Sequence, residues 1–175
     1  MSKVIKYTVF RTKWGFFGLA GTELALLRTS LPLPAADKAK CQLLTGLGTA
    51  RYDGNLFQTA QQQITAYFEG SYVNFSPDIP ILLDGLSWFA HLVLTACRDI
   101  SFGQTISYGQ LAKKVGSPTA GRAVGRVMAQ NPLPLIIPCH RVVRSDGKIG
   151  GFSSVGGVSL KKRMLELERR TLSKR

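Results

Sequence analysis

The first thirty residues alternate between short apolar runs and turn-forming residues. Val, Phe, Leu and Ala gather in residues 4–11, 16–20 and 24–29, and the pairs Trp14-Gly15 and Gly21-Thr22 separate these runs. Apolar runs of this length, bounded by glycine, are typical of strands joined by tight turns. The pattern therefore predicts two or three antiparallel strands that form a small sheet.

A helical period follows the strands. Apolar side chains recur on one face of residues 56–68, after Asn55, which can cap a helix, and before Gly70, which can end one. The stretch from residue 74 to residue 80 contains two prolines and is the predicted connector. We therefore expect two domains, an α/β domain at residues 1–80 and a second domain at residues 81–175.

The second domain has mainly helical patterns. Residues 85–97 are strongly apolar, and we expect His91 among them to pack in the core. Ser107 can cap a short helix that ends at Gly116, and Ser117 followed by proline can begin a second helix over residues 118–130. Two short helices joined by a tight turn predict a helix-turn-helix motif.

The second of these helices has two distinct faces. The predicted buried stripe has helical spacing and contains Ala120, Ala123, Val124, Val127 and Met128, whereas the opposite face holds Gly121, Arg122, Gly125, Arg126 and Ala129. Each exposed glycine costs about 1 kcal/mol relative to alanine. Close approach to a nucleic-acid groove would offset that cost, and so would tight packing against another helix. The small and basic face suits sequence-independent DNA contact better than base reading.

The distribution of charge agrees with a polyanionic partner. The chain carries 23 Lys and Arg against 10 Asp and Glu, a formal net charge of +13. Residues 1–80 contribute +3 and residues 81–175 contribute +10. An excess concentrated in one half favours nucleic-acid binding, although a merely solvated basic surface would look the same.

The most informative motif is Pro138-Cys139-His140-Arg141-Val142, which follows an apolar segment that begins at Asn131-Pro132. A thiolate attacks electrophiles, and it needs a nearby base or cation to form at neutral pH. Here a histidine and an arginine follow the cysteine directly. A buried structural cysteine is the alternative interpretation of the pair alone.

The full string Asn-Pro-x-Pro-x-x-Ile-Pro-Cys-His-Arg-Val resembles the active-site signature of the O6-alkylguanine-DNA alkyltransferases, the methylated-DNA–protein-cysteine methyltransferases. The resemblance extends upstream through residues 107–112 and 121–125, and downstream through residues 150–153 to the C-terminal helix. It covers residues 84–170 well and the N-terminal part only loosely. For the fold, it implies a ribonuclease-H-like α/β domain and a winged-helix-like, mainly α-helical domain.

The resemblance also implies a reaction. The family repairs DNA by direct reversal, in which the thiolate of Cys139 takes the alkyl group from O6-alkylguanine, and from O4-alkylthymine, after the nucleotide is flipped out of the duplex. The thioether that forms is not hydrolysed, so each molecule acts once, and the reaction requires no cofactor. The implied partner is the minor groove of double-stranded DNA containing alkylated bases, bound by a monomer or cooperatively by several copies.

The family pattern assigns roles to individual residues. His140 withdraws the proton from Cys139 through a water, a glutamate on the last helix orients His140, and Asn131 fixes the active-site turn. Tyr108 assists flipping and relieves charge on the leaving guanine, while Arg122 holds the space of the flipped nucleotide. The remaining assignments contact DNA through Gly121, Ala123, Gly125, Arg126 and Ala129, or contact the base through Val142, Ser153, Phe152, Pro134 and Lys161.

Helical geometry selects the glutamate. With Leu160 taken as the origin and about 100° per residue, Glu168 falls near 80°, on the apolar side beside Met164, and Glu166 falls near 240°, facing solvent. A carboxylate on an apolar face needs a partner. Glu168 is therefore the predicted partner of His140.

Composition limits the remaining possibilities. Three widely spaced cysteines, no Cys-x-x-Cys and only two histidines predict no zinc site and a reducing compartment, cytoplasmic or nuclear. No apolar run is long enough for a membrane span, and no signal peptide is expected. Two alternatives stay open: a cysteine hydrolase using Cys139, His140 and Glu168, and a non-enzymatic helix-turn-helix protein that binds DNA.

Overall fold

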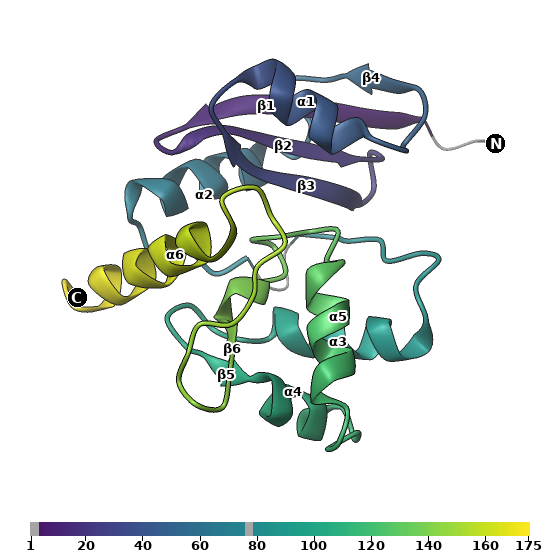
Figure 1. Ribbon diagram of the computed structural model, residues 1–175. Helices are drawn as coiled ribbons and strands as arrows, with labels where there is room; N and C mark the ends of the chain where they lie inside the picture. Colours follow the sequence, from purple (N-terminus) through teal and green to yellow (C-terminus); the bar gives the residue numbers. More distant parts are fainter. Residues whose placement is uncertain (1–3, 76–78) are drawn as a thin grey trace. The chain divides into compact units, whose positions relative to one another are not determined.

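The computed structural model describes residues 4–75 and 79–175 of the chain (Figure 1). The fold divides into two compact units, Met1–Leu82 and Leu83–Arg175. The boundary predicted at residues 80 and 81 lies two residues before this division. Across the described part of the chain, none of the helices is both long and apolar enough to cross a membrane.

The first unit is built on a four-stranded sheet with the order β3-β2-β1-β4. The three predicted strands are present as β1 (Ile5–Thr12), β2 (Gly15–Gly21) and β3 (Leu26–Leu33), paired antiparallel. A fourth strand, β4 (Ala50–Tyr52), was not predicted and pairs parallel to β1, so the sheet is mixed. Three residues are too few to show the alternation that identifies a strand in a sequence.

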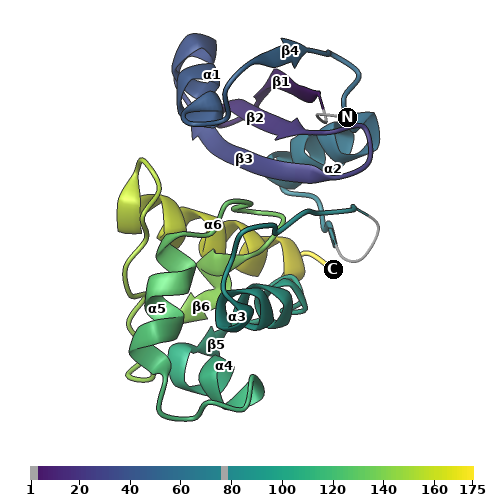
Figure 2. The ribbon, with the colours of Figure 1, turned by 90° about the vertical axis from the view of Figure 1, so that its right-hand side faces the viewer.

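One helix covers each face of this sheet (Figures 1 and 2). Helix α1 (Ala36–Leu44) packs Leu43 against Tyr7 and Ala20, whereas Phe17, which points to the opposite face, lies 6.0 Å from the ring of Phe68 on α2 (Gln58–Glu69). This arrangement agrees with the predicted ribonuclease-H-like unit. Helix α1 was not predicted because its apolar face is short, with only Ala39 and Leu43 buried.

The predicted beginning of α2 was wrong, and its predicted end was correct. Asn55 does not cap the helix; its N–H bonds to the Asp53 carboxylate in the preceding turn, and the helix begins two residues later than expected, with Phe57 in the N-cap position at φ 50°. Gly70 ends the helix with φ 93°, a left-handed conformation that glycine adopts without strain.

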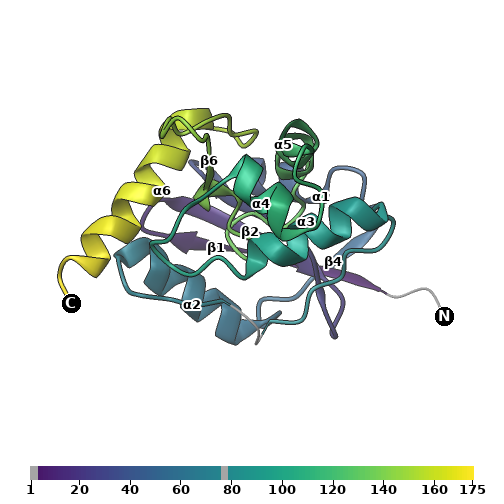
Figure 3. The same ribbon diagram turned by 90° about the horizontal axis from the view of Figure 1, so that it is seen from below.

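The second unit is mainly helical (Figure 3). Its elements are α3 (Trp88–Arg98), β5 (Ile106–Ser107), α4 (Tyr108–Lys114), α5 (Gly121–Ala129), the 3₁₀ turn η1 (Cys139–Arg141), β6 (Val142–Val143) and α6 (Gly157–Leu172). Helices α4 and α5 pack together as the predicted helix-turn-helix, and β5 pairs parallel to β6. The unit thus has the winged-helix-like character that was expected.

Of the two predicted helix starts in this motif, the first is confirmed and the second is wrong. Ser107 caps α4 as predicted, through a reciprocal capping box with Gln110. Ser117 does not cap α5, because residues 118 and 119 form a turn that is closed by a hydrogen bond from the Ala120 N–H to the Ser117 carbonyl. Helix α5 therefore begins at Gly121, three residues later than predicted.

The prediction for His91 was wrong. Its side chain is exposed and stacks on Trp88, with 6.4 Å between the ring centroids and 6° between the planes. The buried residues of α3 are Val93, Leu94 and Cys97. His91 precedes Val93 by two positions, which places it on the other side of the helix.

Candidate functional site

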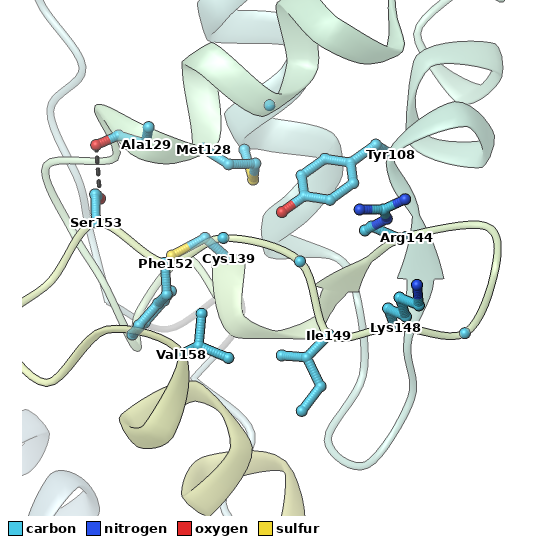
Figure 4. A pocket seen from close by; sticks show the side chains of 14 residues that line it. Tyr108, Met128, Ala129, Cys139, Arg144, Lys148, Ile149, Phe152, Ser153 and Val158 are labelled. Atoms are coloured by element: carbon cyan, nitrogen blue, oxygen red, sulfur yellow. Dashed lines mark hydrogen bonds between the residues drawn. The ribbon is translucent and has the colours of Figure 1, made fainter.

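A cavity of about 950 Å³ in the second unit contains Cys139 in its wall (Figure 4). Tyr108 from α4, Met128 from α5, and Phe152 and Ser153 from the loop before α6 surround the thiol. The Cys139 side chain faces this space, although the residue is only 6% exposed. A buried thiol that borders an open cavity can react only with a group that enters the cavity.

Asn131 organises the turn that carries Cys139. Its side-chain amide donates to the Ile137 carbonyl at 2.9 Å, and its side-chain oxygen accepts from the Leu133 N–H at 3.0 Å. Residues Cys139–Arg141 then form a 3₁₀ turn rather than the end of a regular strand. The structure thus puts Asn131 where the sequence motif predicts a residue that fixes this turn.

The environment of Cys139 favours the neutral thiol at rest. Burial raises its pKa above the usual 9.0, while a hydrogen bond from the Asn131 side chain and the charge of Lys161 act in the opposite direction. A thiolate is the nucleophilic form. The site therefore needs a base that removes the proton when the substrate is present.

His140 and Arg141, which follow Cys139 in the chain, form a buried network with Glu168 of α6. His140 Nε2 lies 2.7 Å from Glu168 Oε1, and the Gly103 N–H donates to Glu168 Oε2 at 2.8 Å. Arg141 Nε lies 3.2 Å and 3.1 Å from the two carboxylate oxygens, and its Nη2 lies 2.9 Å from Oε1. Glu168 is 0% exposed, as the helical geometry of the sequence indicated, and Glu166 is partly exposed.

The charges in this network set its protonation. Burial alone would raise the pKa of Glu168, but the hydrogen bonds and charges of His140 and Arg141 outweigh it and lower the pKa to about 2. Because the ionised carboxylate can only accept, His140 Nε2 carries the hydrogen. Burial lowers the pKa of His140, so its ring is neutral at pH 7 and can act as a base through Nδ1.

Lys161 of α6 forms hydrogen bonds to three other segments of the site. Its fully buried side chain donates to the Val142 carbonyl at 2.6 Å, to the Gly151 carbonyl at 3.2 Å and to the Tyr108 hydroxyl oxygen at 3.4 Å. Burial lowers the pKa of this ammonium group from 10.5 to about 8. Lys161 is therefore charged at pH 7 and anchors both the loop before α6 and Tyr108.

Tyr108 has a glycine on each side of its ring. A Cβ atom at Gly125 would lie 4.0 Å from the ring, and one at Gly150 would lie 3.1 Å from the ring and the hydroxyl. Gly150 also has φ 78°, which disfavours other residues. Burial raises the pKa of Tyr108, so its hydroxyl keeps the proton and can donate it as a hydrogen bond.

The outer face of α5 combines small and basic residues. Arg122, Arg126 and Ala129 are exposed, whereas Gly121, Ala123 and Gly125 are half-buried. A Cβ at Gly121 would meet the backbone of Gly109 on α4 at 3.8 Å, which is ordinary contact and does not itself require glycine. Helix packing alone therefore does not explain the two glycines of α5.

The residues expected to contact the base are not all at the cavity. Ser153 and Phe152 line it, and Ser153 Oγ donates to the Ala129 carbonyl at 2.8 Å (Figure 4). Pro134 is half-buried in the turn before Cys139, and the Val142 carbonyl already accepts a hydrogen bond from Lys161. Of the five residues expected to contact the base, Phe152 and Ser153 therefore line the cavity, whereas Pro134, Val142 and Lys161 do not.

Several residues of the site were not assigned a role from the sequence. The sequence identifies Arg141 only as a cation close to Cys139, yet the residue is 4% exposed and binds Glu168. An arginine inside an apolar motif signals a buried partner, because a buried charge must be paired. Arg144 and Lys148 at one side of the cavity (Figure 4) lie in an irregular loop whose course the sequence does not reveal.

Within residues 4–75 and 79–175, no group of three or more His, Cys, Asp or Glu residues could hold a metal ion. Cys41, Cys97 and Cys139 all carry free thiols.

Comparison with known proteins gives consistent matches. Residues 88–170 match the family model described as 6-O-methylguanine DNA methyltransferase, DNA binding domain. Among curated proteins, the methylated-DNA–protein-cysteine methyltransferase of Methanosarcina acetivorans is 39% identical over 112 residues, which covers 64% of this chain and 69% of that protein. The protein of the same name from Mycobacterium tuberculosis is 40% identical over 117 residues, 67% of this chain and 68% of its own length.

Solved structures agree over nearly the whole chain. The crystal structure of Mycobacterium tuberculosis OGT in complex with DNA superposes with a TM-score of 0.80 at 32% identity, and covers 95% of this chain and 94% of that one. The crystal structure of Mycobacterium tuberculosis O6-methylguanine methyltransferase gives a TM-score of 0.78 at 31% identity, covering 96% and 94%. The likeness therefore includes the N-terminal unit, which the sequence motifs matched only loosely.

Proposed function

Because this chain belongs to the family of methylated-DNA–protein-cysteine methyltransferases, which repair DNA by moving an alkyl group to a cysteine, we propose that Cys139 is the acceptor. The supporting observation is the position of its thiol. Cys139 borders a cavity of about 950 Å³ and directly precedes His140, which is paired with the buried Glu168. DNA is the partner, and the alkyl donor is O6-alkylguanine or O4-alkylthymine within it.

The first step is loss of the thiol proton. His140 Nδ1 accepts the proton from Cys139 through a water, and Glu168, 2.7 Å from Nε2, stabilises the imidazolium that results. Lys161 stabilises the thiolate, since its positive charge lowers the pKa of Cys139. His140 and Lys161 together offset the effect of burial, which raises the pKa of Cys139 and otherwise keeps its thiol neutral.

The second step is an in-line displacement. The Cys139 sulfur forms a bond to the alkyl carbon, the bond between that carbon and guanine O6 breaks, and its electron pair stays on the guanine. Tyr108 relieves the developing charge by donating its hydroxyl hydrogen to the base. Lys161 donates to the Tyr108 oxygen at 3.4 Å, which leaves the tyrosine hydrogen available for that purpose.

The product is S-alkylcysteine, a thioether without an acyl group for water to attack. Each molecule of protein therefore acts once. The protein binds as a monomer, or cooperatively along the duplex, and works inside the cell. Its three free thiols suit a reducing compartment.

The second unit carries the residues that contact DNA. Helix α5 lies in the minor groove with Arg122 and Arg126 toward the duplex, both of which are exposed. Arg122 takes the space of the extruded nucleotide, while Tyr108 guides that nucleotide toward Cys139. Arg144 and Lys148 lie beside the cavity, where they can contact the phosphates of the damaged strand.

Intact mass spectrometry after incubation with excess O6-methylguanine duplex, followed by peptide mapping, tests this function. We expect a gain of one methyl group on Cys139 that saturates at one per molecule. Tight lesion binding without an adduct would overturn the transfer reaction and favour a non-enzymatic DNA-binding protein. Turnover of an acyl substrate, with neither adduct nor lesion binding, would favour a cysteine hydrolase.

Arg122→Ala is expected to slow transfer from duplex DNA by about 10- to 100-fold, because flipping costs a few kcal/mol that the inserted side chain helps to offset. Transfer from free O6-benzylguanine should change little, since a free base needs no flipping. Single-turnover rates with both substrates measure the difference. The neighbouring exposed Arg126→Ala serves as the comparison and should weaken binding more than flipping. Equal slowing of Arg122→Ala on both substrates would remove the wedge role.

Lys161→Met is expected to raise the pKa of Cys139 and slow its reaction by about tenfold at pH 7, since one pKa unit corresponds to tenfold in proton affinity. The difference from the wild type should shrink above pH 8, because Lys161 itself loses its proton at about 8. Iodoacetamide labelling of Cys139 as a function of pH, resolved by peptide mapping, measures it. Lys162→Met, on the exposed side of α6, is the matched control. An unchanged pH profile would contradict a role for the Lys161 charge.

A further inference from the structure

Arg141 makes more contacts in the buried network than the proposed reaction requires. Besides its three contacts with Glu168, its Nη1 donates to the Ile100 carbonyl at 2.6 Å, and its guanidinium lies 5.7 Å from the Phe102 ring centroid. The side chain does not line the cavity and is 4% exposed. Any effect of Arg141 on a reaction in the cavity must therefore pass through the groups that it contacts, of which Glu168 is the charged one.

Glu168 Oε1 is shared between Arg141 and His140. It lies 2.9 Å from Arg141 Nη2 and 2.7 Å from His140 Nε2, at a place where all three side chains are almost fully buried. Arginine stays protonated in proteins, so this cation is permanent. The carboxylate is thus already neutralised before His140 takes up any proton.

We propose that Arg141 is a positioning residue for alkyl transfer: by neutralising the buried Glu168 carboxylate, it keeps His140 uncharged and ready to accept the Cys139 proton. This inference rests on the proposed role of His140 as the base. Without Arg141, the lone buried carboxylate would draw a proton onto its histidine neighbour, because a buried charge without a partner is strongly unfavourable. A histidine that is already protonated cannot accept the thiol proton.

The other charged and titratable groups around His140 do not replace this effect. Lys161 on α6 is the second cation, but it is directed at the Val142 and Gly151 carbonyls and at Tyr108. Cys139, Cys97 on α3 and Tyr108 on α4 stay neutral at pH 7, because burial raises their pKa values. Arg141 and Lys161 both act to lower the pKa of His140, and Glu168 acts to raise it. Of these two cations, Arg141 is the one that contacts the carboxylate of Glu168.

The sign of the pH effect follows from these charges. Arg141→Gln removes the cation and leaves Glu168 facing His140 alone, so the pKa of His140 should rise by about one unit or more, a tenfold change in proton affinity. The acid limb of the rate should then move to higher pH by the same amount. Arg141→Lys keeps the positive charge and should restore most of the wild-type profile, although it loses the bidentate geometry.

Nuclear magnetic resonance can follow His140 directly, because the chain has only two histidines and the exposed His91 is an internal reference. The imidazole shifts are titrated in the wild type, Arg141→Gln and Arg141→Lys without DNA, and single-turnover transfer is measured over the same pH range. Arg170→Gln, an exposed arginine on α6, is the control and should change neither. Titration without DNA separates this inference from the proposed function, since it does not depend on alkyl transfer.

We expect His140 to be neutral at pH 7 in the wild type and to titrate at higher pH in Arg141→Gln, with a matching shift of the acid limb. An unchanged His140 titration in Arg141→Gln, with a rate lowered equally at every pH, would reduce Arg141 to a structural role. If Arg141→Gln does not fold, the wild-type titration still decides. A protonated His140 at pH 7 would overturn the inference without any variant.

Discussion

Replacing Cys139 with alanine is expected to abolish alkyl transfer and to leave DNA binding within about twofold of the wild type. The reaction needs a sulfur nucleophile, and a methyl side chain cannot form the S-alkyl bond. DNA binding rests on phosphate contacts from basic residues outside the thiol's surroundings, such as the exposed Arg126. Adduct formation by mass spectrometry and affinity for an O6-methylguanine duplex at fixed salt concentration measure the two effects separately.

Cys41→Ala is the matched control for this experiment. Cys41 is an exposed free thiol in the first unit, so its loss should change neither transfer nor binding. A loss of DNA binding together with transfer in Cys139→Ala would indicate a structural cysteine. Transfer that survives in Cys139→Ala would show that another side chain receives the alkyl group.

Replacing Glu168 with alanine is expected to destabilise the second unit by about 3–5 kcal/mol, because it leaves the buried Arg141 without its carboxylate. Transfer should fall as well, because His140 loses the group that orients it. Urea unfolding at pH 7 measures the stability, and single-turnover kinetics measure the transfer. Glu166→Ala, on the more exposed side of the same helix, should change stability by less than about 0.5 kcal/mol.

The acid dependence of stability gives a second test of Glu168. Its pKa in the folded protein is about 2, below the usual 4.5, so the folded state favours the ionised form. Stability from this group is present above pH 4.5 and is lost as the pH falls from 4.5 toward 2. Glu168→Gln should therefore lose stability less steeply than the wild type in that range. If the stability of Glu168→Gln falls with pH as steeply as that of the wild type, groups other than Glu168 cause the acid sensitivity.

The chemistry-bearing residues were largely predictable because their signals are local. The proline-framed motif around Cys139 identified the family, and the helical spacing of Met164 and Glu168 was enough to place the carboxylate on the buried face of the last helix. The capping box at Ser107 was likewise predictable, since Ser107 and Gln110 lie three residues apart and contact each other directly. Each of these patterns depends only on residues that are close together in the chain, so each can be recognised from the sequence without the tertiary structure.

The predictions that were wrong concern two helix starts and one buried face, and they share a different cause. Asn55 and Ser117 are good capping residues, but each lies in a turn whose hydrogen bonds are formed with its own neighbours, so the helices begin later. The side of α3 on which His91 lies depends on which face packs inward, and several apolar residues were available for that face. Local residue preferences allow several helix starts and several buried faces, and tertiary packing determines which of them forms.

The sequence by itself thus determined the family, the candidate nucleophile, the helix-turn-helix and the face of the last helix that carries Glu168. Only the tertiary structure decided that Arg141, two residues after Cys139 in the chain, contacts Glu168 and shares one carboxylate oxygen with His140. The physical reason is that burial and charge pairing depend on distances between segments far apart in the chain. Residue spacing along the sequence does not contain those distances.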